Sequence, residues 1–436
     1  MEWWHLLLLM FGGLGLMFAS GMPIFAAFGL LNIVLFYFLA GGTGALQAVA
    51  LSSYGSVATF AFTALPMFIV MGEVILHSGL AKLAIDAMGN WLGRMPGRLA
   101  VLAVLGGTVF GAASGSSMAS AAMLGRVLIP EMRRRGYDKG LSVGCIATCG
   151  ALDVLIPPSA LGVIFASIAR LSVADILIGS LIPGLILAVM ILGYIIVVCT
   201  LKPHLAPAYD VEPISFTQKV RSSVHVLPLF ILIAFVLGTM FFGVTTPTES
   251  AAIGAVGAFI VAACYGKLDK TVIRKSLMSA VEVTGLALLI VTSATAFSQV
   301  LSLTGAASGL AEFATNLPVS PWIILVSMQA VMLIMGLFID EISIMLITIP
   351  IFFPVVKALG FDQTWFAIVS MVNMEIGVIS PPFGLVLFVL KGVCPSDISL
   401  TDIFRGVMPF IAVNIAALGL IMAFPALATW LPSLMH

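Results

Sequence analysis

The sequence predicts an all-α integral membrane protein made of two inverted repeats. Hydrophobic residues form 61% of its 436 residues and charged residues 9%, whereas a soluble domain carries about 25% charged residues. Two proline-interrupted apolar segments, 150–162 and 376–388, lie 224 residues apart (381 − 157), and Pro130 and Pro354 share this offset. We therefore interpret the chain as a duplication in which each copy carries a helix broken at membrane depth, where the freed backbone groups must line a polar cavity.

The first repeat, expected at 1–200, contains apolar segments long enough to cross a bilayer, since a span needs about 20 mostly apolar residues. The expected spans are 3–20, 22–40, 57–77, a broken helix at 141–170, and 176–199. Residues 99–129 are apolar, rich in glycine, serine and alanine, and flanked by basic residues. This pattern predicts a re-entrant helical hairpin that enters and leaves on one face.

The second repeat, expected at 225–436, follows the same order after a proline-containing cytoplasmic connector at 201–224. Its expected elements are spans at 225–243, 245–265 and 278–303, a hairpin at 321–356, a broken helix at 364–391, and a span at 405–430. About five spans plus one hairpin give an odd number of crossings per copy. The two copies are therefore expected to be inverted relative to each other.

The distribution of charge predicts the orientation. If the flanks of the first hairpin are cytoplasmic, all of the 19 basic residues lie in or beside inner loops except Arg170 and Lys357, as the positive-inside rule requires. We expect a multi-pass protein of the bacterial inner membrane, embedded in the lipid bilayer, with both termini periplasmic. A net charge of zero gives no basic surface for nucleic acid.

Polar residues cluster at the tips of the two expected hairpins. Ser114, Gly115, Ser116 and Ser117 suit a tight turn whose hydroxyl and carbonyl oxygens hold a monovalent cation; the alternative is helix packing through small residues. In the second hairpin, Asp340 and Glu341 interrupt an apolar run. An acid there binds a cation or carries a proton, unless the tip merely reaches interfacial water.

The broken helices add further candidates. The pairs Pro157–Pro158 and Pro381–Pro382 remove backbone donors and free carbonyl oxygens for a cation, while the half-helices that restart after them favour an anion. The other polar residues near the breaks are Ser159, Ser380, and the candidate buried acids Asp153 and Glu375. Glu249 fits a different role, that of a carboxylate at a helix N-terminus.

Together these motifs resemble the large membrane subunit of tripartite ATP-independent periplasmic (TRAP) transporters. They are SGSS followed by Ala119, LIPEMRRRGYDKG at 128–140, LIPPS at 155–159, TPTES at 246–250, GLFIDEISIMLITIP at 336–350 and SPPFG at 380–384. The resemblance implies an elevator-type sodium symporter of the ion-transporter superfamily. It also implies two partners, a periplasmic substrate-binding protein and a small four-helix membrane subunit.

The resemblance also implies the binding residues. The first sodium site would use Ser114, Gly115, Ser116, Ser117, Pro157 and Ser159, and we add the candidate buried acid Asp153 to it from its position beside the break. The second would use Asp340, Ser343, Ser380, Pro381 and Gly384. Substrate would lie between the tips, at Ser117, Pro158, Ser159, Asp340 and Pro382. Two positions depart from the family pattern, because Asp153 stands where glycine is usual and Val386 where asparagine is frequent.

The expected function is that of a transporter subunit, not an enzyme, which imports small organic acids such as C4-dicarboxylates, sugar acids or keto acids with Na+ as coupling ion. One alternative is a self-sufficient sodium/dicarboxylate symporter, which the missing Ser-Asn-Thr signature at the hairpin tips disfavours. Another is a proton-conducting subunit of a membrane complex. That function requires lysines or a chain of acids in mid-membrane helices, whereas the basic residues here lie at loops and span ends.

Overall fold

The computed structural model describes residues 2–39, 42–114, 117–207, 215–224 and 226–435, and this part of the chain contains helices and no strands. The all-α class is thus confirmed. The helices of the first half are α1 (Trp3–Ala19), α2 (Ile24–Leu39), α3 (Thr43–Val57), η1 (Phe60–Thr63), α4 (Ala64–His77), α5 (Leu80–Trp91), α6 (Arg98–Ser114), α7 (Ser117–Arg134), α8 (Lys139–Asp153), α9 (Ala160–Ala169) and α10 (Val173–Leu201).

The second half follows the connector elements η2 (Pro203–Leu205) and α11 (Phe216–Ser223). Its helices are α12 (Leu227–Phe241), α13 (Pro247–Cys264), α14 (Lys270–Leu303), α15 (Ala306–Asn316), α16 (Pro321–Gly336), α17 (Glu341–Ala358), α18 (Gln363–Val378), α19 (Leu385–Val393), α20 (Leu400–Ala423) and α21 (Ala426–Ser433). The expected hairpins correspond to α6–α7 and α16–α17, and the expected breaks lie between α8 and α9 and between α18 and α19.

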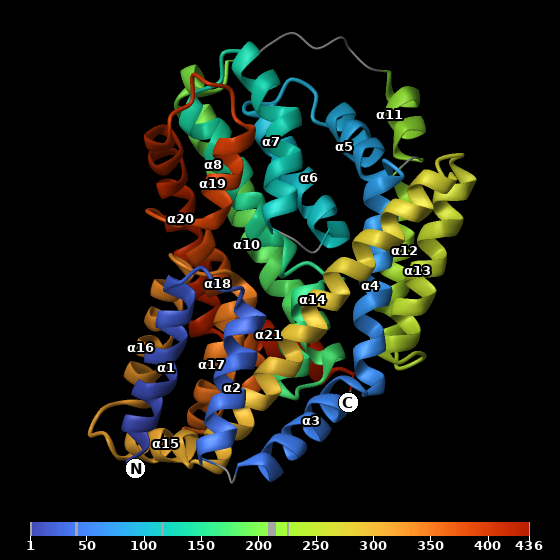
Figure 1. The fold of residues 1–436 in the computed structure, drawn as a ribbon. Coiled ribbons are helices and arrows are strands. Elements are labelled where there is room, and N and C mark those ends of the chain that lie inside the picture. Colours follow the sequence, from blue (N-terminus) through green and yellow to red (C-terminus); the bar gives the residue numbers. More distant parts are fainter. Residues whose placement is uncertain (1, 40–41, 115–116, 208–214, 225, 436) are drawn as a thin grey trace.

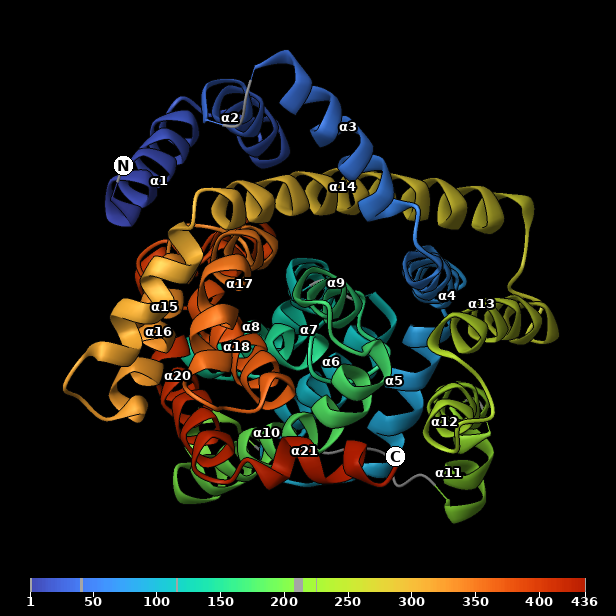
Figure 2. The same ribbon diagram turned by 90° about the horizontal axis from the view of Figure 1, so that it is seen from below.

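The helices form a central group and a peripheral frame. In the centre, α8 packs against α6, α7 and α20, and α18 packs against α16, α17 and α20. The 34-residue helix α14 passes along one side of this group and contacts α2, α3 and α4 (Figures 1 and 2). The start of α1 and the end of α21 lie in the same half of the molecule as α3 and α15, while α11 lies at the opposite end (Figure 1).

Local sequence explains where several of these helices begin. Thr246 and Glu249 form a capping box at the start of α13, with Pro247 as the first helical residue, so the predicted role of Glu249 at a helix N-terminus is confirmed. Ser159 caps α9 by accepting a hydrogen bond from the backbone N–H of Gly162 (3.1 Å). Asp340 caps α17 in the same way.

Several expected boundaries are wrong. The span at 57–77 begins with η1 and becomes α-helical only at Ala64, after which α4 bends by 62° into α5. The expected terminal span at 405–430 is divided at Phe424 into α20 and α21, because Pro425 has no N–H with which to continue the helix. The segments 41–56 and 304–320 lie between the expected spans and were therefore expected to be connections, but they contain the helices α3 and α15.

The apolar helices of the described chain differ in length. Five are long and apolar enough to cross a membrane individually, α10, α13, α14, α17 and α20, or up to seven if each bent pair is one span. Shorter apolar helices include α1, α2 and α16. These lengths support a multi-pass membrane protein, while the inverted relation of the repeats stays a prediction.

Candidate ion and substrate site

The two hairpins meet at Ser117, the first residue of α7 and 2% exposed. Its hydroxyl lies 2.9 Å from Oε1 and 3.1 Å from Oε2 of Glu375 in α18, and 3.2 Å from Oε1 of Glu341 in α17. A hydroxyl has a single proton to donate, so it serves the two carboxylates in turn. Ser117 therefore joins the first hairpin to the second hairpin and to the second broken helix.

The positions of these residues repeat the internal offset of the sequence. Ser117 and Glu341 are 224 residues apart, and each is the first residue of the second arm of its hairpin. Equivalent residues of two copies contact each other when they lie near the axis that relates the copies. This contact supports the predicted internal symmetry.

Asp153, the last residue of α8, lies beside this junction and is fully buried. Neither carboxylate oxygen has a hydrogen bond of ordinary geometry with a described residue, although the Ser120 hydroxyl lies close enough to interact with the carboxylate. Gly111 in α6 provides the space, since a Cβ there would lie 1.7 Å from Oδ1 of Asp153. The equivalent position in the second copy (153 + 224 = 377) is Gly377, which packs directly against Gly336. The extra carboxylate is thus specific to the first copy.

Asp153 lies on the face of α8 that approaches the tip of the first hairpin. Gly150, one helical turn earlier, would bring a Cβ within 3.0 Å of the Ser117 Cβ, and residues three apart share a helix face. Asp153, Glu341 and Glu375 form no salt bridge with a described residue. An unpaired buried carboxylate is energetically costly, so such a group at membrane depth indicates a functional site.

The predicted residues of the second sodium site are more dispersed. The Asp340 carboxylate accepts hydrogen bonds from the backbone N–H groups of Ile342 (3.1 Å) and Ser343 (3.2 Å), and from the Ser343 hydroxyl. The Ser380 hydroxyl donates to the carbonyl of Ile376 in its own helix (2.6 Å). Capping and helix bonding thus account for the contacts of these three side chains.

The breaks themselves are tightly built. The peptide bonds Pro157–Pro158 and Pro381–Pro382 are both cis. Gly384 closes the second break, where its N–H donates to the Ser380 carbonyl (3.0 Å) and an added Cβ would lie 2.6 Å from the carbonyl oxygen of Val378. A side chain at position 384 would therefore displace the backbone of the turn.

The predicted sites and the structure differ in which residues come together. Ser117 and Asp153 lie at the junction, whereas the side chain of Ser114 and the residues Gly115 and Ser116 lie outside the described part of the structure. Glu341 and Glu375 were recognised as acids in apolar segments but assigned to neither site. An acidic residue within an apolar segment is itself a sign of a functional site, and this was the signal that would have identified them.

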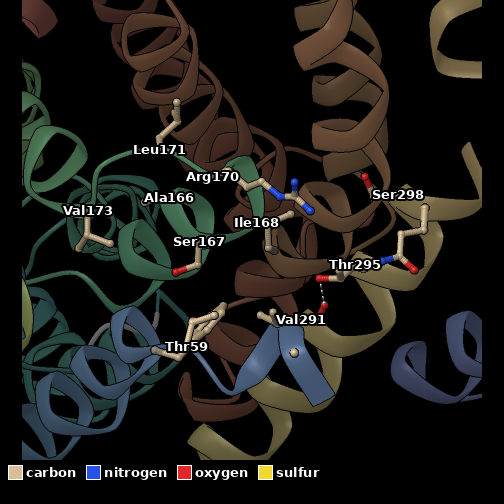
Figure 3. Close-up of a pocket in the computed structure, with 14 residues that line it drawn as sticks. Thr59, Ala166, Ser167, Ile168, Arg170, Leu171, Val173, Val291, Thr295 and Ser298 are labelled. Carbon is tan, nitrogen blue, oxygen red and sulfur yellow. Dashed lines mark hydrogen bonds between the residues drawn. The ribbon is translucent and has the colours of Figure 1, made fainter. Parts of the chain in front are cut away.

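A separate cavity lies away from the junction. It has a volume of about 580 Å³ and lies between α9, the η1 region and α14 (Figure 3). None of the residues predicted to bind substrate lines it.

In the described residues, no three His, Cys, Asp or Glu side chains are arranged to hold a metal ion, so the junction offers a few oxygen atoms and not a preformed carboxylate cage.

Comparison with known proteins decides the family. Residues 11–427 match the family model described as "Tripartite ATP-independent periplasmic transporter, DctM component". The chain belongs to this family. It is the large membrane subunit of a TRAP transporter, as the sequence motifs indicated.

Relatives and a solved structure agree with this assignment. The C4-dicarboxylate TRAP transporter large permease protein DctM of Pseudomonas aeruginosa is 32% identical over 93% of this chain and 92% of its own length. The sialic acid TRAP transporter large permease protein SiaM of Vibrio cholerae is 27% identical over 97% of each chain. The YdaH transporter of Alcanivorax borkumensis shares the fold, with a TM-score of 0.67 at 13% identity, over 89% of this TRAP subunit and 91% of YdaH.

Proposed function

We propose that this TRAP subunit imports a small organic acid together with sodium, after a periplasmic binding protein delivers the acid. The observation that carries the proposal is the buried carboxylate of Asp153, which has no salt-bridge partner among the described residues and lies beside the Ser117–Glu341–Glu375 contact. Three acids in one buried region repel one another when ionised. A bound cation offsets that repulsion, and hydroxyl and carboxylate oxygens suit an alkali ion.

The relatives and the broken helices support the proposed substrate class. Two relatives are named for C4-dicarboxylates and for sialic acid, which are all carboxylates. The restarted helix α9, capped by Ser159, presents a helix N-terminus at the first break, and such ends favour anions. Delivery by a soluble binding protein and assembly with a small membrane subunit accord with the tripartite family description.

Ion gradients test the coupling. The chain is reconstituted in liposomes with its small subunit and binding protein, and a sodium gradient or a pH gradient is imposed separately with labelled succinate outside. We expect uptake with the sodium gradient alone. Equal uptake driven by protons without sodium would refute sodium coupling.

Proton coupling is the second candidate, and Ser117 favours it. One hydroxyl proton between two carboxylates leaves the second carboxylate without a donor unless one of the acids is protonated. Glu375→Gln keeps a donor at this position permanently. If a proton is carried, this variant will lose the pH dependence of uptake; if only sodium is carried, sodium activation will weaken and the pH profile will keep its shape.

The requirement for a binding protein distinguishes the tripartite transporter from a self-sufficient symporter. We expect no uptake at micromolar succinate by liposomes that lack the binding protein, and uptake when it is added. A rate that is the same in both preparations would instead establish a self-sufficient symporter.

The motion is part of the proposal. The hairpins and broken helices would slide as one unit against the frame that contains α14, with inverted repeats giving the two end states. Helices α9 and α14 contact each other across this boundary. A disulfide between Ala166→Cys in α9 and Val291→Cys in α14 should stop uptake and reduction should restore it. Full uptake by the crosslinked protein would exclude a sliding unit.

A further inference from the structure

The 580 Å³ cavity has the composition of an anion site. Of the described residues that line it, Arg170 alone is charged, and no carboxylate is among them. The neutral polar residues of the lining are Thr59, Ser167, Thr295, Ser298 and Gln299. Ligand pockets for small molecules usually enclose about 300–1,000 Å³, with a few polar groups that fix orientation.

Arg170 points into this cavity. It follows α9, and Figure 3 shows its guanidinium extending towards α14, where Thr295 and Ser298 lie. The side chain is exposed and forms no hydrogen bond or ion pair with a described residue. A guanidinium that lacks a protein carboxylate is able to bind one from a ligand in a bidentate manner.

The backbone at Arg170 adds an independent observation. Its φ of 56° makes it the one non-glycine residue with positive φ in the described chain. This position, one past the end of a helix, favours glycine because glycine has no Cβ to strain the left-handed conformation. The chain thus retains an arginine where glycine would be more stable, and the side chain then faces the cavity.

We propose that the Arg170 cavity is an outer binding site for a small carboxylate, occupied before the anion reaches the junction of the hairpins. Arg170 is one of the two basic residues that the charge distribution places outside the cytoplasmic loops. Ser159 and Arg170 lie at opposite ends of α9, about 15 Å apart along the helix axis. The inference rests on the proposed import function for its physiological ligand, whereas binding itself is measurable without transport.

A cysteine on the wall of the cavity reports on binding there. Ser298→Cys is introduced into full-length protein that carries Cys264→Ser and Cys394→Ser, since the remaining cysteines are buried. The protein is placed in zwitterionic nanodiscs, and the rate of labelling by an anionic methanethiosulfonate reagent is measured with succinate or with neutral succinamide. We expect succinate to slow labelling and succinamide to have no effect. Equal labelling with and without succinate would overturn the proposal.

Variants assign the effect to Arg170. Arg170→Gly suits the left-handed backbone, so it should fold, and protection should require an about tenfold higher succinate concentration because one charge-assisted bidentate contact is lost. Lys357→Gln is the matched control, because Lys357 lies outside the cavity, and it should protect as the parent does. Unchanged protection in Arg170→Gly would show that succinate acts from another site and overturn the proposal.

Two further results distinguish a bound carboxylate from a lipid headgroup, and the cavity inference from the proposed import function. If labelling without succinate is slow in anionic nanodiscs and fast in zwitterionic ones, and Arg170→Gly abolishes this difference, the occupant is a phospholipid headgroup and the proposal is wrong; a difference that Arg170→Gly leaves unchanged is the repulsion of the anionic reagent by the lipid surface. If protection depends on Arg170 while reconstituted protein imports no carboxylate, the cavity inference stands and the proposed function fails. The two claims are therefore refuted by different results.

Discussion

Replacing Ser117 with alanine removes the hydroxyl that lies between Glu341 and Glu375. The side chain is 2% exposed, so bulk water does not readily replace it. Its closest contact, 2.9 Å to Glu375, has ordinary hydrogen-bond length. A hydrogen bond to a charged group contributes about 1.5–3 kcal/mol.

This energy predicts the size of the effect. If the hydroxyl orders the carboxylates that hold the cation, its loss weakens sodium binding by about 10- to 100-fold, since 1.4 kcal/mol corresponds to a factor of ten. The assay is the sodium concentration that gives half-maximal uptake, with the thermal midpoint of the purified protein measured with and without sodium. Ser117→Ala should raise that concentration and reduce the stabilisation by sodium.

Thr348→Val is the matched control. Like Ser117, Thr348 is buried. It lies in α17, and its hydroxyl donates to the Ile344 carbonyl of its own helix (2.7 Å). We expect a change in unfolding free energy of about 1 kcal/mol or less and unchanged sodium dependence. The reasoning is refuted if Ser117→Ala keeps the parental sodium dependence, or if both variants shift it equally.

Three stability predictions follow from other contacts, each read as a thermal midpoint. Gly406→Ala would place a Cβ 2.5 Å from the Gly140 carbonyl oxygen, so it should lower the free energy of unfolding by about 1–3 kcal/mol. Gly419→Ala in the same helix meets open space and should leave the midpoint unchanged. Equal midpoints for the two variants would contradict this packing. Asn373→Leu removes the amide that donates to the backbone (2.6 Å) and side-chain (2.8 Å) oxygens of Gln329, so it should lower the free energy of unfolding by about 1–3 kcal/mol. A midpoint equal to that of the parent would show that these hydrogen bonds do not stabilise the protein. Thr246→Ala breaks the capping box of α13 and should cost about 1 kcal/mol, and no change would mean that water replaces the cap.

Local rules explain what the sequence was able to predict. The breaks at Pro157 and Pro381 follow from missing backbone donors, and the hairpins follow from small residues between apolar arms. The helices α3 and α15 were missed because their sequences are less apolar than a span, so they resembled connections. Helix capping by Asp340 is local as well, but a single acid at an expected hairpin tip has several possible roles.

Packing between distant segments explains what the sequence was unable to predict. Ser117 and Glu375 are 258 residues apart, and nothing in either segment specifies the other as its partner. The unpaired state of Asp153 likewise depends on Gly111, which provides the space, and on the surrounding helices. The cavity around Arg170 needs α9 and α14 side by side, and that arrangement appears only in three dimensions.

The length of α14 has a consequence for how the protein responds to its membrane. Its 34 residues extend about 51 Å, while the hydrocarbon core of a bilayer is about 30 Å thick. Helices usually tilt by about 20°, but this one would need roughly 50° to stay within the core, or about 40° if its basic first turns lie among the headgroups. A thinner bilayer would flatten α14 further and displace α2, α3 and α4, which it contacts. The length of the lipid chains would therefore change the positions of the frame helices against which any transport movement takes place.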